Sequence, residues 1–115
     1  MQIQAPLIGA YLEEFVAILA KAKDPHTTTP EIMLQGRSIQ VIKNLRERFS
    51  FISGLRLGTK EFFARALTSL EKNSFSQGIK DAEKEMHALI SYSFKKLSSQ
   101  DKKLLYNVLP QEFKN

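Results

Sequence analysis

The chain has no cysteine among its 115 residues, which excludes disulfide bonds, thiolate zinc sites and a cysteine nucleophile. A secretory signal is missing as well, because the first stretch, MQIQAPLIGAYLEEF, has neither a basic region nor a small-residue cleavage site. The most apolar segment, residues 6–23, is interrupted by Glu13 and Glu14 and is short for a bilayer span. We therefore expect a cytoplasmic protein with no membrane segment; a protein secreted without a signal peptide would have the same features.

Catalytic and cofactor signatures are also missing. There is no glycine-rich phosphate loop, and the two histidines, His26 and His87, do not share ligand spacing with other metal-binding side chains. Glu83 precedes His87 by one helical turn, an arrangement that is more often a surface contact than a site. We expect no catalysis by the chain itself, no cofactor and no metal.

Charge is present in ordinary amount but is unevenly distributed. Residues 1–36 hold two lysines and four acidic residues, a net charge of −2, whereas residues 37–115 hold fifteen basic and eight acidic residues, a net charge of +7. The whole chain has a net charge of +5. Such an imbalance favours an acidic partner, whether protein, nucleic acid or membrane surface.

Apolar residues recur with helical spacing along almost the whole chain, and no segment alternates in the manner of a strand. Thr29, Thr59 and Ser98 are suited to cap helices, and Gly54 is suited to end one. The pattern predicts helices over residues 6–23, about 31–53, 60–72, 77–97 and 98–109. Residues 1–115 are thus predicted to form a single all-α domain, an orthogonal or up-and-down bundle of four to five amphipathic helices.

Residues 52–72, ISGLRLGTKEFFARALTSLEK, resemble the turn and second helix of winged helix-turn-helix regulators in their LG...R-x-L-x-x-L pattern. The resemblance implies that residues 37–72 contact nucleic acid. A DNA-reading helix carries polar side chains in its first turn, but Phe62 and Phe63 stand there. We favour the alternative interpretation, a helical hairpin with both phenylalanines directed toward the core.

The helix predicted at residues 6–23 is apolar over more than half its circumference, because Ala10, Ala17 and Ala20 lie opposite the main apolar stripe. A peripheral helix needs only one buried stripe. The extra apolar face therefore indicates either a central position in the bundle or contact with another chain, including a homodimer through residues 6–23.

Protein interfaces commonly combine apolar and charged surface, and this chain has both an apolar helix face and a basic surface. We therefore predict binding to another protein, one with an acidic surface, in the manner of the small inhibitors, immunity proteins or adaptors found in bacterial systems. Nucleic-acid binding is the alternative. The residues predicted to contact the partner are Tyr11, Phe15, Ile18, Arg46, Arg48, Arg56, Lys95 and Lys96.

Overall fold

The fold is an all-α bundle, as the helical periodicity predicts. A computed structural model describes residues 4–114, and no strand occurs among them. Its elements are α1 (Ala5–Lys23), α2 (Glu31–Ser50), α3 (Lys60–Lys72), α4 (Phe75–Lys96), α5 (Ser99–Val108) and the short 3₁₀ helix η1 (Gln111–Phe113).

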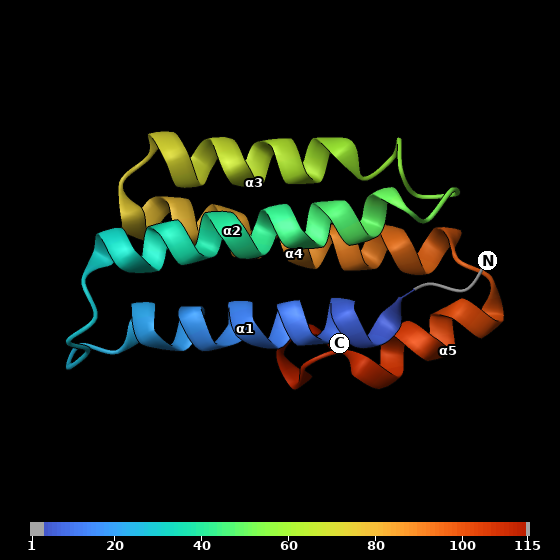
Figure 1. Ribbon diagram of the computed structural model, residues 1–115, viewed down its shortest axis with the longest axis horizontal. Helices are drawn as coiled ribbons and strands as arrows, with labels where there is room; N and C mark the ends of the chain where they lie inside the picture. Colours follow the sequence, from blue (N-terminus) through green and yellow to red (C-terminus); the bar gives the residue numbers. More distant parts are fainter. Residues whose placement is uncertain (1–3, 115) are drawn as a thin grey trace.

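Helices α1 to α4 run up and down along the long axis of a molecule that measures 42 × 24 × 20 Å (Figure 1). The most extensive helix pairs are α3 with α4 and α1 with α2, and α5 packs on α1 near the end where α1 begins. This topology places the end of α2, the start of α3, the end of α4 and the start of α5 at the same end of the bundle (Figure 1).

One apolar core joins all these elements. It contains the stripe residues of α1 to α4 together with Leu105 and Leu109 from the C-terminal part. Phe49 of α2 and Phe63 of α3 meet at its centre with ring centroids 5.7 Å apart. Burial of these large side chains, each worth about 1.5–3 kcal/mol, is the main force that holds the helices together.

The position of α1 explains part of its broad apolar surface. Besides the contact with α2, α1 is covered by α5 and by part of α4. At Gly9 an added Cβ would lie only 2.7 Å from the Cβ of Val108, so the absence of a side chain allows α5 to approach closely. Ala5 and Gly9 are therefore buried within the chain itself, whereas Ala10, Ala17 and Ala20, on the face opposite the main stripe, remain exposed.

Several details of the helix ends differ from the sequence prediction. Helix α2 ends at Ser50, three residues before the predicted end, and Gly54 lies in the turns that follow. Thr29 does not cap α2, whose N-cap is Pro30. Thr59 does stand at the N-cap of α3, but its hydroxyl donates backward to the Leu55 carbonyl at 2.9 Å instead of accepting from the helix.

The two serine caps have the geometry that capping requires. Ser98 accepts a hydrogen bond from the Asp101 amide at 3.2 Å, as predicted. Ser74 accepts one from the Gln77 amide and starts α4 two residues earlier than the predicted position.

The α2–α3 unit does not have the shape of a helix-turn-helix. In that motif the helices cross at about 90–120° and are joined by a turn of about three or four residues. Here α2 and α3 lie side by side along the bundle axis, and nine residues, 51–59, connect them (Figure 1). Phe63 of α3 is buried in the core and Phe62 is half-buried, in agreement with the hairpin interpretation.

Candidate functional site

The three predicted contact residues of α1 are not on a free surface. Phe15 is fully buried, Ile18 is 4% exposed, and Tyr11 is half-buried against the core. The stripe to which Phe15 and Ile18 belong faces the other helices of the same chain, so neither side chain is exposed to a partner in this structure. What α1 leaves outside is a row of mostly small and acidic side chains that includes Ala10, Ala17, Glu13 and Glu14.

The basic residues predicted to contact a partner, in contrast, gather at one end of the bundle. They come from the last turns of α2, from the α2–α3 connection and from the last turn of α4, which Figure 1 places together. We call this surface the basic end and define it by Arg46, Arg48, Arg56, Leu57, Lys60, Lys95 and Lys96.

A cleft of about 390 Å³ opens in the basic end between α2 and the start of α3. Arg46 enters it from α2, Arg56 from the connection and Lys60 from the first position of α3. The other lining residues are Ser50, Leu57, Thr59 and Phe63. Two residues selected from the sequence, Arg46 and Arg56, thus lie on one cleft, which we call the cation cleft.

The three cations of this cleft have no acidic partner within ion-pair distance among residues 4–114. Nearby carboxylates are engaged elsewhere. Glu47 pairs with Arg48 at 2.7 Å, and Glu61 lies 3.8 Å from Arg65. The cleft therefore carries a local positive charge that the fold leaves uncompensated.

Apolar side chains stand among these cations. Leu57 is 75% exposed, and Phe51 at the end of α2 is 52% exposed. The Arg48 guanidinium lies over the Phe51 ring at 5.1 Å from its centroid, a cation–π contact. Leu57 could not be identified from the sequence, because a single leucine in a turn has no periodicity that would show whether it is buried.

Tyr92 connects the end of α4 to the α2–α3 connection. Its ring lies against the space where a Cβ on Gly58 would stand, and it packs on Phe62 with ring centroids 5.6 Å apart. The Lys96 ammonium is 5.7 Å from the centroid of the same ring. Lys96 is thereby held next to the segment that carries Arg56 and Leu57.

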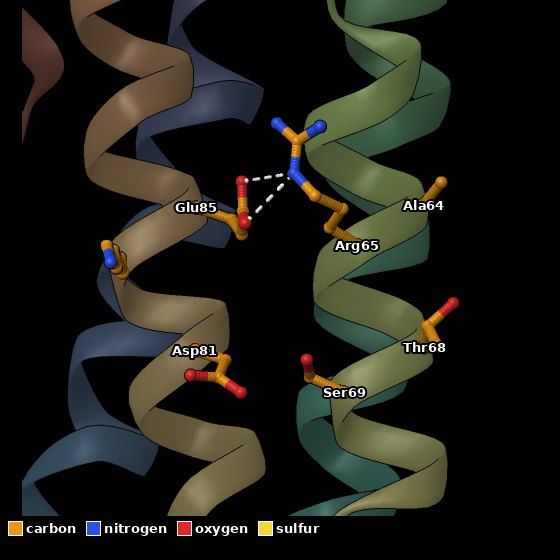
Figure 2. A pocket seen from close by; sticks show the side chains of 7 residues that line it. Ala64, Arg65, Thr68, Ser69, Asp81 and Glu85 are labelled. Atoms are coloured by element: carbon orange, nitrogen blue, oxygen red, sulfur yellow. Dashed lines mark hydrogen bonds and ion pairs between the residues drawn. The ribbon is translucent and has the colours of Figure 1, made fainter.

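A second hollow, between α3 and α4, is polar and internally paired. Figure 2 shows Arg65 reaching from α3 toward Glu85 on α4, with Ser69 and Asp81 further along the same groove. The Arg65 Nε donates to both carboxylate oxygens of Glu85 at 3.1 and 3.0 Å. This hydrogen bond raises the pKa of Arg65 above its ordinary value. The cation and the carboxylate thus satisfy each other, and Asp81 accepts hydrogen bonds from the side-chain amides of Asn73 and Gln77.

The histidine of α4 also has a structural partner. His87 stacks on Phe113 of η1 with ring centroids 4.4 Å apart, and Glu83 pairs with Lys23 at 3.6 Å. Within residues 4–114 no group of three or more His, Asp or Glu side chains is placed to hold a metal ion. In the same range, no helix is both long enough and apolar enough to cross a membrane.

Comparisons of the sequence with protein-family models, with curated proteins and with solved structures find no match. The geometry and charge of the basic end therefore carry the functional interpretation.

Proposed function

We propose that the chain works by binding another protein through its basic end. The observation that carries this proposal is the cation cleft, in which Arg46, Arg56 and Lys60 lack acidic partners and surround the exposed Leu57. Charges left uncompensated by the fold, next to an exposed aliphatic side chain, add nothing evident to stability. They are well suited to a partner that supplies carboxylates and an apolar contact.

Protein interfaces combine an apolar centre with a polar rim, and arginine is enriched in them. In the basic end, Leu57 and the Phe51 ring would form the centre, and the arginines with Lys95 and Lys96 would form the rim. An acidic partner would be attracted before contact by the net positive field, which raises the rate of association.

Nucleic acid is the second candidate, because the same cations could neutralise phosphates. Proteins that bind single strands stack bases on aromatic rings. The side chain that stands most exposed here is the aliphatic Leu57, and Arg48 already covers one face of Phe51. These contacts favour a protein partner. They are less suited to nucleic-acid binding through residues 37–72.

The test is affinity capture with immobilised protein from a nuclease-treated extract of the cells that make it, at an ionic strength of about 0.15 M. The variant combines Arg46→Glu with Arg56→Glu. A matched control combines Lys72→Glu with Lys80→Glu, two exposed lysines at the opposite end of the bundle. Both variants change the net charge by the same amount.

We expect one or more proteins to be retained by the wild type and by the control but lost by the cleft variant. Equal retention by both variants would show that the basic end is not the interface. Retention by the wild type from an untreated extract, with none from the nuclease-treated extract, would favour the nucleic-acid alternative.

A further inference from the structure

We infer that the cation cleft recognises an acidic segment of its partner in which one apolar side chain stands between carboxylates. This inference rests on the proposed function and adds to it the chemistry of the partner. The cleft would take the apolar side chain inside and pair the flanking carboxylates with the cations at its rim.

The shape of the cleft supports an apolar occupant. Its volume of about 390 Å³ leaves room for one large side chain. Leu57 provides the exposed apolar wall and the buried Phe63 lies behind the cleft. The aliphatic stems of Arg46, Arg56 and Lys60 extend the apolar lining toward the solvent. A fully hydrated ligand would gain little binding free energy from contact with this apolar lining. An aliphatic or aromatic side chain would gain more, because its apolar surface would be removed from water there.

The rim supports carboxylates as the flanking groups. A guanidinium binds a carboxylate through two parallel hydrogen bonds, and two of the three rim cations are arginines. The third, Lys60, stands at the first position of α3, where the partial positive charge of the helix N-terminus makes a cation unfavourable for the helix. A bound carboxylate would compensate Lys60 and the helix terminus together.

A phosphate chain fits these observations less well. Phosphates could pair with the rim, but a nucleic-acid backbone has no aliphatic side chain to fill the space beside Leu57 and Phe63. The combination of cations with an apolar lining therefore favours a peptide, in which charged and apolar groups alternate at short spacing.

The probe is a fluorescein-labelled peptide with the sequence Glu-Glu-Asp-Leu-Asp-Glu, and binding is followed by fluorescence anisotropy. One matched peptide replaces the leucine with serine, and a second replaces the acidic residues with their amides. We expect each replacement to lower the affinity by about tenfold or more, since each removes either the apolar contact or the charge pairs.

Two pairs of variants locate the site. Leu57→Ser is compared with Ile32→Ser, since Ile32 is equally accessible, 79% exposed, but lies at the start of α2, at the opposite end. The Arg46→Glu, Arg56→Glu variant is compared with the Lys72→Glu, Lys80→Glu variant. We expect only Leu57→Ser and the cleft pair to weaken binding, again by about tenfold or more, with unchanged circular dichroism spectra.

An affinity that does not change when the leucine of the peptide or Leu57 of the protein is replaced would overturn the inference, because the contact would then be purely electrostatic. Displacement of the peptide by oligo(dT) at a lower concentration than by the unlabelled peptide would overturn it in favour of nucleic acid. If no acidic peptide binds but capture of an intact protein still depends on Arg46 and Arg56, this inference fails while the proposed function stands. If capture is indifferent to Arg46 and Arg56, the proposed function fails.

Discussion

At the scale of single residues, two glycines within helices occupy opposite environments. Gly9 of α1 faces the Val108 backbone and side chain of α5, whereas an added Cβ at Gly36 of α2 would have no neighbour within 4 Å. A glycine inside a helix costs about 0.5–1 kcal/mol relative to alanine. That cost has a packing reason at Gly9 and none at Gly36.

We predict that Gly36→Ala stabilises the protein by about 0.5–1 kcal/mol, the ordinary gain in helix propensity. Gly9→Ala should instead destabilise it by about 1–2 kcal/mol, because overpacking against Val108 exceeds the same gain. Urea unfolding followed by circular dichroism measures both. A Gly9→Ala variant as stable as Gly36→Ala would mean that α5 does not pack on α1 at this point.

Single residues also mark the limit of what the sequence can predict about the site. In the basic chain, Arg46 is a candidate because it flanks the apolar stripe of α2, and Arg56 because it stands in the turn before α3. Nothing in their spacing showed that Lys60 and Leu57 would join them at one cleft. That juxtaposition depends on the nine-residue connection 51–59, whose turns are stabilised by tertiary contacts such as the complete burial of Leu55.

At the scale of elements, the helices themselves were predictable and their ends less so. An amphipathic stripe extends over many residues, so the bounds of α3 and the existence of α1, α2, α4 and α5 follow from periodicity. A helix end depends on one or two hydrogen bonds. Ser98 makes the bond that its position suggests, whereas Thr59 gives its hydroxyl to the Leu55 carbonyl.

The capping difference gives a second prediction. Ser98→Ala should cost about 1 kcal/mol, because α5 is short and would lose the acceptor for the Asp101 amide. Thr29→Ala should change stability by less than about 0.5 kcal/mol, since Thr29 does not cap α2. Both are measured by urea unfolding. Equal effects of the two substitutions would contradict the assigned caps.

At the scale of the whole molecule, the apolar residues that hold the bundle together and the basic residues proposed to bind a partner lie in different places. The apolar stripe of α1, which includes Phe15 and Ile18, is used within the bundle. The segments that carry the residues of the basic end meet at one end of the long axis. The sequence showed that both an apolar surplus and a basic surplus exist. It could not show that α5 folds back onto α1 at Gly9, because that contact joins residues about a hundred positions apart.

We therefore predict that the wild type is monomeric in solution, with a mass near 13.1 kDa, and that Ala17→Glu leaves that mass unchanged. The face of α1 that remains outside carries Glu13 and Glu14 among its alanines, so two copies joined there would bring like charges together. Light scattering coupled to size exclusion measures the mass. A dimeric wild type converted to a monomer by Ala17→Glu would establish self-association through residues 6–23.

The central claim is that the basic end is the binding surface, and nuclear magnetic resonance of the ¹⁵N-labelled chain tests it most directly. Backbone amide shifts are recorded with and without the protein that affinity capture retains. We predict that the largest changes fall in residues 46–60 and 92–96, which meet at this end of the bundle. Changes concentrated instead on the outer face of α1, or around Ile32 and Met33 at the opposite end, would contradict the account.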